Sequence, residues 1–171
     1  MNIFVAGSTG VLGRRIVVLL VSQGHEVTAL TRREDRAGLL SSLGAHPVVA
    51  DALDPGSLGA AVRQNPPDAV LHMLTDLAAG TSASNAALRS RGTRNLIDAA
   101  HAAGASRVVS ESIAWAYAAG RKPADESVPL DLAAGEPRQA TVRGVAGEQG
   151  GRGPRRPHGH RGRCHQFRPC G

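Results

Sequence analysis

Aromatic residues, cysteines and long apolar runs are all scarce in this chain of 171 residues. Aromatic side chains make up 2% of the chain, so its core must come from the Ala, Val, Leu and Ile of a 42% hydrophobic fraction. No apolar run reaches the ~18 residues that a membrane-spanning helix needs. The two cysteines, Cys164 and Cys170, lie in the last eight residues, so they carry no information about the core. A chain of this length is typical of one domain. The lack of a long apolar run argues against a membrane-spanning helix.

Surplus charge is also missing from most of the chain. Residues 1–150 contain 14 Lys plus Arg and 14 Asp plus Glu, so their net charge is zero. The net charge of +6 comes from six arginines in residues 151–171. Any argument from charge to nucleic acid therefore concerns the tail alone. The chain starts with a strand pattern and not with a basic, then apolar, signal peptide, so we expect a cytoplasmic protein.

A glycine-rich turn near the amino terminus is the strongest local signal. Residues 2–6 (NIFVA) form a short apolar run that predicts a buried strand, and a helical apolar period begins at Val11. Gly7, Gly10 and Gly13 lie between them. Such a strand-to-helix turn is where a Rossmann-type fold binds the pyrophosphate of a dinucleotide. A plain strand–turn–helix is the alternative.

Each glycine has a separate physical reason in this interpretation. Gly7 permits the tight turn, Gly10 lets the backbone approach the phosphates, and Gly13 lets the helix pack closely on the sheet. The amino end of the helix presents N–H groups and a positive dipole to an anion. The hydroxyl groups of Ser8 and Thr9 are expected to add hydrogen bonds to it.

The spacing G-x-x-G-x-x-G resembles the short-chain dehydrogenase/reductase superfamily, and its details resemble the extended and atypical branch. This branch includes NAD(P)-dependent epimerase/dehydratase and NmrA-like proteins, and the resemblance covers residues 1 to about 149. Within the predicted helix 83–103, the family pattern N-x-x-G-T-x-N-L is resembled by Asn85, Gly92, Thr93, Asn95 and Leu96. The resemblance implies that the turn as a whole binds the cofactor, through Gly7, Ser8, Thr9, Gly10, Val11, Leu12 and Gly13.

Strand and helix patterns alternate along the chain. Strands are predicted at 2–6, 25–30, 46–50, 69–73 and 107–110, and helices at 11–23, 36–43, 58–64 and 83–103. This alternation predicts an α/β fold with a Rossmann-like, doubly wound parallel sheet of strand order 3-2-1-4-5. The cofactor cleft is then expected at the carboxyl ends of the first and fourth strands.

The residues after the second strand favour NADP over NAD. A Rossmann domain that prefers NAD has an acidic residue about 20 residues after the glycines, where it bonds the ribose 2′-hydroxyl. Here that position has Thr31, Arg32 and Arg33, and the first carboxylate is Glu34. Because guanidinium groups suit a 2′-phosphate, we expect NADP(H). The alternative is that both arginines are the solvated start of a helix.

Two further segments fall on the cleft by resemblance. Asp51, with Ala52 and Leu53, resembles the family segment beside the adenine. Asp51 is expected to accept a hydrogen bond from the exocyclic amine of the adenine. The nearby Asp54 is better explained as a helix N-cap before a proline. His72 and Thr75 fall where the family lines the nicotinamide side, mostly through backbone groups, although His72 also fits a core histidine without a base or metal partner.

The catalytic half of the resemblance is incomplete. Ser112 matches the position of the family's catalytic serine, with a strand-end hydroxyl as the alternative. The family then needs Tyr-x-x-x-Lys on the next helix, near 141–149, but the matching positions are Ala140 and Gly144. The one tyrosine, Tyr117, is therefore the remaining candidate acid/base, although its neighbours argue against a helix there.

Composition changes abruptly within a few residues of Glu148. Residues 151–171 contain no Ala, Val, Ile, Leu or Met, so we assign 1–149 to the NAD(P)-binding domain and 150–171 to a disordered basic tail. A reading-frame change in a GC-rich gene would produce this switch, and the other frames of the coding DNA would test it. RNA binding by the arginines and Phe167 is one alternative. Zinc binding is another, through His158, His160, Cys164, His165 and Cys170, but their spacing fits no standard site, so no metal is expected.

Together these patterns predict an NAD(P)-binding protein of the epimerase/dehydratase type whose catalysis is impaired. The alternative is a non-catalytic NADP-sensing or binding module. A small-molecule substrate is expected, a membrane partner is not, and the sequence does not indicate an oligomeric state.

Overall fold

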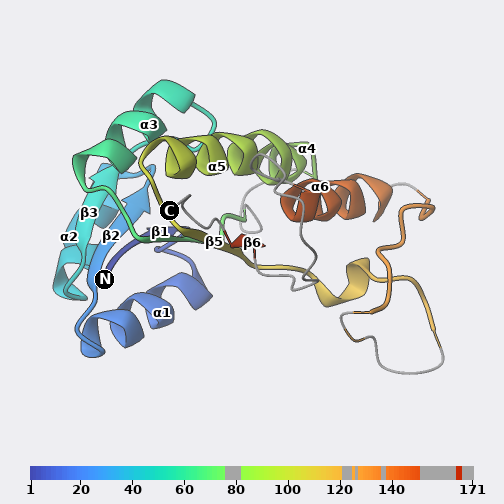
Figure 1. Cartoon of the computed structure of the whole chain (residues 1–171), viewed down its shortest axis with the longest axis horizontal. Helices are drawn as coiled ribbons and strands as arrows, with labels where there is room; N and C mark the ends of the chain where they lie inside the picture. The colour runs from blue at the N-terminus through green and yellow to red at the C-terminus, as the bar shows by residue number, and fades with distance from the viewer. Residues whose placement is uncertain (76–81, 121–124, 126, 136–137, 151–164, 167–171) are drawn as a thin grey trace.

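The alternating strands form one parallel sheet with helices on both faces (Figure 1). The computed structural model describes residues 1–75, 82–120, 125, 127–135, 138–150 and 165–166. The five parallel strands follow the order 3-2-1-4-5, which confirms the predicted α/β fold. They are β1 (Asn2–Ala6), β2 (Glu26–Thr31), β3 (His46–Val49), β4 (Ala69–His72) and β5 (Arg107–Ser110).

The described helical segments are more numerous than the sequence predicts, although the predicted helices lie close to their expected places. They are α1 (Val11–Ser22), η1 (Glu34–Arg36), α2 (Ala37–Ser42), α3 (Pro55–Gln64), α4 (Ser82–Ala87), η2 (Leu88–Gly92), α5 (Thr93–Ala102), η3 (Ala114–Ala116) and α6 (Arg138–Gly150). The long helix predicted over 83–103 is present as the contiguous elements α4, η2 and α5, but the sequence did not predict the π-helical turn η2 within it. A π turn takes in an extra residue and shifts the buried face. Here Leu88 and Arg89 are buried.

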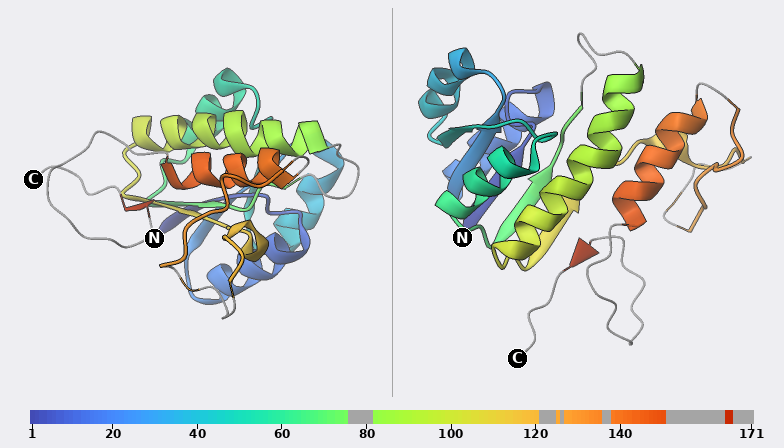
Figure 2. Two further views of the ribbon diagram at one scale, coloured as in Figure 1. Left: turned by 90° about the vertical axis from the view of Figure 1, so that its right-hand side faces the viewer. Right: turned by 90° about the horizontal axis from the view of Figure 1, so that it is seen from above.

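The central strand explains why the core divides into two layers. Successive side chains of β1 point to opposite faces of the sheet. Ile3 and Val5 pack with residues of α1 and α2, whereas Phe4 and Ala6 pack with residues of α3 and α5. Figure 1 shows α1 below the sheet and α3 and α5 above it, and Figure 2 shows the same layers from two other sides. The core is mostly aliphatic, as the composition predicts.

Helix α6 packs beside η2 and α4 and closes a third, smaller cluster of Ala116, Ala134, Val142 and Val145 (Figure 2). The Arg138 guanidinium donates to the carbonyl oxygens of Trp115 (2.7 Å) and Tyr117 (3.0 Å). Arg138 also forms an ion pair with Asp131, in which Nη1 lies 2.9 Å from Oδ2. Arg138 therefore ties the start of α6 to the segment that follows β5.

A sixth strand that the sequence did not predict lies at the edge of the sheet. β6 (His165–Gln166) pairs antiparallel with Arg107 and Val108 of β5. The other residues of 151–171 lie outside the described residues. They include Phe167 and most of the candidate zinc ligands, and the predicted disorder of the tail stays a prediction. Across the part of the chain that is described, no helix combines the length and apolar character needed to cross a membrane.

Candidate dinucleotide-binding site

The turn between β1 and α1 leaves no room for side chains at two of its three glycines. Gly7 has a φ of +93°, and a Cβ there would lie 2.3 Å from the Met73 carbonyl oxygen. A Cβ on Gly13 would lie 2.1 Å from the Gly7 carbonyl oxygen. Both positions therefore need glycine, the first for the turn and the second for the close approach of helix and strand.

Gly10 differs from the other two glycines. Its φ of −70° suits any residue, and a Cβ there would meet only the Gly7 carbonyl oxygen, at 3.3 Å. It is the N-cap of α1, with no side-chain capping bond. The first N–H groups of α1 have no partner within the helix, so they are available to an anion. Gly10 keeps the approach to them open.

The Ser8 hydroxyl has a different place from the one predicted. Ser8 is fully buried, and its Oγ donates to the Leu30 carbonyl oxygen at 2.6 Å. The predicted hydroxyl contact with the phosphates is therefore wrong for Ser8, because the side chain ties the turn to the end of β2. Thr9 is half-buried on the cleft side of the turn.

One cleft of about 620 Å³ lies over the carboxyl ends of the strands. Ten of the predicted cofactor residues line it, namely Gly7, Thr9, Gly10, Val11, Leu12, Gly13, Arg32, Arg33, Asp51 and Ala52. Thr75, which the resemblance places on the nicotinamide side, also lines it. The remaining lining residues are not in the predicted cofactor set, namely Arg14, Leu30, Thr31, Arg36, Ala50, Met73, Leu74, Leu88 and Glu111. Its volume is in the range of sites that hold cofactors.

The β2 side of the cleft is rich in arginine. Arg14, Arg32, Arg33 and Arg36 all line it. Arg33 donates from Nε to Asp35 at 2.9 Å and from Nη2 to the other carboxylate oxygen at 2.5 Å. These hydrogen bonds raise the pKa of Arg33 and lower the pKa of Asp35. Since both side chains are exposed, Arg33 can exchange this pairing for a ligand phosphate at small cost.

The β3–α3 loop presents Asp51 to the cleft in a fixed conformation. Its Oδ1 accepts a hydrogen bond from the Leu53 N–H at 2.9 Å, and Ala52 accepts one from the Asn95 side chain at 3.0 Å. Asp54 caps α3 by accepting bonds from the Gly56 and Ser57 N–H groups, as predicted. Leu53 does not line the cleft in the described part of the chain, and its side chain lies toward Gly92 instead.

His72 is a core residue. It is 3% exposed, its Nδ1 accepts from the Leu74 N–H at 3.2 Å, and its Nε2 lies 2.6 Å from the Thr93 hydroxyl. Burial, and next the charge of Arg89, lower the pKa of His72 to about 4. The neutral ring is therefore held in the tautomer that donates to Thr93. The family-based prediction that His72 itself lines the cofactor cleft is not met in the described structure, where the next residues, Met73 to Thr75, line it.

Neither candidate catalytic residue is brought to the cleft. Ser112 is exposed, and Tyr117 is half-buried in extended backbone that forms a single bridge with Leu130. Among the described residues, neither lines the cleft. On α6, a Cβ at Gly144 would lie 3.0 Å from the Arg89 side chain, so this position packs against η2.

Glu111, which follows β5, lines the cleft instead. Its N–H donates to the His72 carbonyl oxygen at 2.9 Å, so the residue continues the pairing of β5 with β4. Sequence reasoning treated this residue only as part of the strand end. The signal that would have found it is a carboxylate directly after a strand of a doubly wound sheet.

The chain's own residues fit a dinucleotide. Side chains at Gly7 and Gly13 are excluded by the fold, whereas the space beyond Gly10 is open and faces the amino end of α1. Basic side chains lie on one side of this point and the ends of β4 and β5 on the other. A pyrophosphate at α1 would thus have room for a nucleoside on each side.

Comparison with known proteins agrees with this geometry. Residues 7–136 match the model of the NAD(P)H-binding family. A 3-diazoavenalumate denitrifying reductase from a Streptomyces species is 43% identical over an alignment of 154 residues, which covers 85% of this chain and 49% of the relative. The chain thus spans about half the length of this curated relative.

Solved structures show the same architecture. A short-chain dehydrogenase/reductase superfamily protein from Agrobacterium tumefaciens with bound NAD has a TM-score of 0.70 and 28% identity, covering 88% of this chain and 44% of its own. UDP-glucose 4-epimerase from Thermotoga maritima, at 16% identity and a TM-score of 0.71, shares the fold, covering 87% of this chain and 49% of its own. The chain belongs to the NAD(P)H-binding family, within the epimerase- and reductase-like short-chain dehydrogenase/reductase superfamily.

Proposed function

We propose that the chain binds NADP(H) in this cleft and acts as a reductase on a small electrophilic molecule. The observation that carries the proposal is the continuity of the cleft. One volume joins the arginines after β2, the glycine turn after β1, and Thr75 and Glu111 after β4 and β5. When bound, the reduced cofactor supplies a hydride to a substrate. The chain's own residues bind its phosphates, orient its two halves and line the place of reaction.

Preference for NADP over NAD rests on the β2 side of the cleft. The 2′-phosphate of the adenosine ribose would meet Arg32 and Arg36, and Arg33 once it exchanges its contact with Asp35. A guanidinium binds phosphate through two parallel hydrogen bonds. Asp51 would accept a bond from the adenine amine in the same region. A cytoplasmic location fits this activity, because the cytoplasm supplies nicotinamide cofactors.

The substrate class is suggested by the acid/base groups that the cleft does not present. In the described residues, Ser112 and Tyr117 both lie off the cleft lining. A reaction that consumes no proton would not need them. Reductive removal of an aryl diazonium group is such a reaction, because hydride forms a C–H bond while the C–N bond breaks and N2 leaves with the bonding pair. The similarity to a denitrifying reductase of a diazo compound makes this the first reaction to test.

The experiment combines calorimetric titration of NADPH and NADH with a turnover assay. An aryl diazonium salt is the probe, and the absorbance of the reduced nicotinamide is followed. Gly10→Val, which should not bind cofactor, measures the uncatalysed background. We expect NADPH to bind more tightly than NADH, and we expect Ser112→Ala and Tyr117→Phe to keep the turnover of the unmodified chain. Loss of turnover in either variant would show that conventional serine–tyrosine catalysis operates and would overturn the proposed mechanism.

A non-catalytic NADP-binding module is the second candidate function. The position of Ser112 and Tyr117 off the cleft favours it as much as it favours proton-independent reduction. Tight binding of NADPH without turnover of any diazo, quinone or carbonyl probe would support this second function. In that case the cofactor's redox state would be the quantity that the protein detects.

A further inference from the structure

Glu111 is a carboxylate at a defined end of the cleft. The four strand ends that face the cleft follow one another in space, because β2, β1, β4 and β5 are neighbours in the sheet. Arg32 follows β2, Gly7 follows β1, Met73 follows β4 and Glu111 follows β5. Neighbouring strands lie about 4.8 Å apart, so the arginine side and Glu111 are separated by roughly 14 Å.

The glycine turn divides this distance. The Met73 N–H donates to the Ala6 carbonyl oxygen at 2.8 Å, and the Met73 carbonyl oxygen lies against Gly7. The end of β4 therefore touches the turn that would hold the pyrophosphate. If the phosphorylated adenosine lies over β2, as the proposed function requires, the nicotinamide half extends across β4 toward β5. Of the described residues that line the cleft, Glu111 is then the acidic one on the nicotinamide side.

We propose that Glu111 makes this site bind the oxidised cofactor more tightly than the reduced cofactor. The nicotinamide ring is a cation when oxidised and neutral when reduced, so a nearby carboxylate stabilises the oxidised form alone. The same preference makes the bound reduced cofactor a stronger hydride donor, because positive charge develops on the ring as hydride leaves. This inference rests on the proposed function for the orientation of the cofactor.

The expected size follows from Coulomb's law. Two unit charges about 6 Å apart, at an effective dielectric constant of about 40 for an exposed carboxylate, give roughly a tenfold ratio of dissociation constants. A tenfold ratio in favour of the oxidised form lowers the two-electron potential of the bound cofactor by about 30 mV. Glu111 changes the potential of the cofactor through its negative charge, without contacting the substrate.

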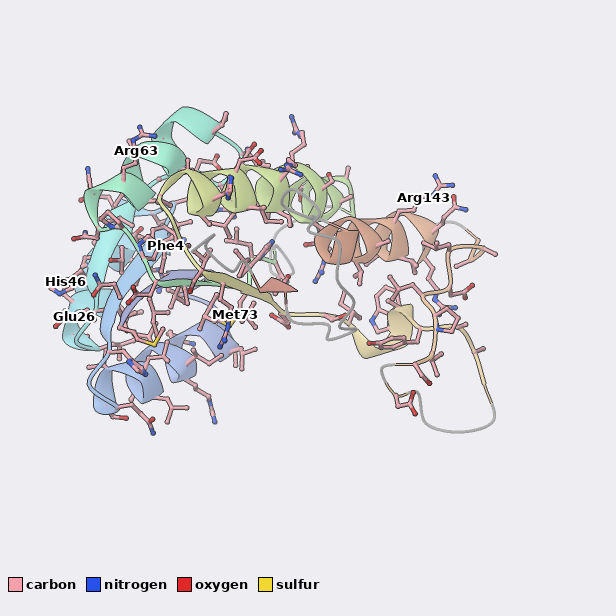
Figure 3. All side chains as sticks on the ribbon, in the orientation of Figure 1. Phe4, Glu26, His46, Arg63, Met73 and Arg143 are labelled. Atoms are coloured by element: carbon pink, nitrogen blue, oxygen red, sulfur yellow. The ribbon has the colours of Figure 1, made fainter. Side chains whose placement is uncertain are left out.

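The test is calorimetric titration of the full chain and of Glu111→Gln with NADP⁺ and NADPH. Glu26→Gln is the matched control, since it changes the net charge equally. Glu26 pairs with His46 at 3.2 Å on the β2–β3 edge, and Figure 3 shows both well apart from Met73. Glu111→Gln should lower the affinity ratio of NADP⁺ to NADPH about three- to tenfold, mainly because NADP⁺ binds more weakly. It should leave the melting temperature unchanged. Glu26→Gln should keep the original preference.

Three outcomes decide between the ideas. An unchanged NADP⁺/NADPH ratio in Glu111→Gln, with the unmodified chain binding both forms, overturns the role of Glu111 and leaves the proposed function intact. An equal loss of affinity for NADP⁺ and NADPH in Glu111→Gln also overturns the charge role of Glu111, because a purely steric role would produce that result. Failure of the unmodified chain to bind either form overturns the proposed function and this inference together.

Discussion

Gly10 and Gly13 should respond in opposite ways to substitution, although both belong to the same turn. A Cβ on Gly13 would lie 2.1 Å from the Gly7 carbonyl oxygen, about 1 Å inside the closest approach that real Cβ atoms make. Overpacking of this kind costs about 1–3 kcal/mol. At 2–4 °C per kcal/mol for a chain of this size, Gly13→Ala should lower the melting temperature by roughly 3–10 °C.

Gly10→Val should instead keep the fold and lose the cofactor. The φ of −70° suits a side chain, and the tight 3.3 Å contact of a Cβ with the Gly7 carbonyl oxygen needs a shift of only a few tenths of an ångström. The weaker N-cap costs about 1 kcal/mol or less. The side chain would project into the space that the pyrophosphate needs at the amino end of α1. Affinity for NADPH should fall at least about tenfold.

Thermal melts and calorimetric titration of both variants provide the comparison. A Gly13→Ala variant that melts like the unmodified chain would show that the close approach of α1 to the turn is not as tight as described. A Gly10→Val variant that binds NADPH with unchanged affinity would show that the cofactor does not use this turn. Either result would refute the steric reasoning on which the site rests.

Three further predictions concern other parts of the chain. The double substitution Arg32→Ala and Arg33→Ala should reduce the ratio of NADPH to NADH affinity, because each lost charge-assisted hydrogen bond costs about 1.5–3 kcal/mol of binding free energy. An unchanged affinity ratio would contradict the NADP assignment. Since the pKa of His72 is about 4 in the folded chain and 6.5 when exposed, protonation favours the unfolded state between these values. Stability should fall by about 2 kcal/mol from pH 7.5 to 5, measured by urea unfolding, and His72→Gln should lose most of this dependence. Deletion of 151–171 should leave NADPH affinity unchanged, because β6 pairs with Arg107 and Val108 at the start of β5, whereas the cleft lies beyond its end.

Local pattern was sufficient where one strand, one turn and one helix determine the structure. The apolar run of β1, the glycines and the period of α1 predicted both the elements and the place of the cleft, and Asp54 before Pro55 predicted an N-cap. The strand order followed from the alternation, because crossover connections in parallel sheets admit few topologies. These features need no knowledge of distant contacts.

Side-chain destinations were less predictable. Ser8 donates to Leu30, which is 22 residues away, and His72 bonds to Thr93, 21 residues away. Whether Glu111 or Ser112 faces the cleft depends on how β5 ends beside β4, and no local pattern encodes that pairing. In the π-helical turn η2, the Arg89 side chain is likewise buried against Gly144 of α6, a contact between distant parts of the chain. Tertiary packing decides these positions.

The most direct test of the account is the structure of this chain crystallised with NADP⁺. We predict the pyrophosphate within hydrogen-bonding distance of the N–H groups at the start of α1, the 2′-phosphate beside Arg32 and Arg36, and the nicotinamide ring between Thr75 and Glu111. A cofactor bound in the reverse direction, with adenosine beside Glu111, or bound outside this cleft, would contradict the account.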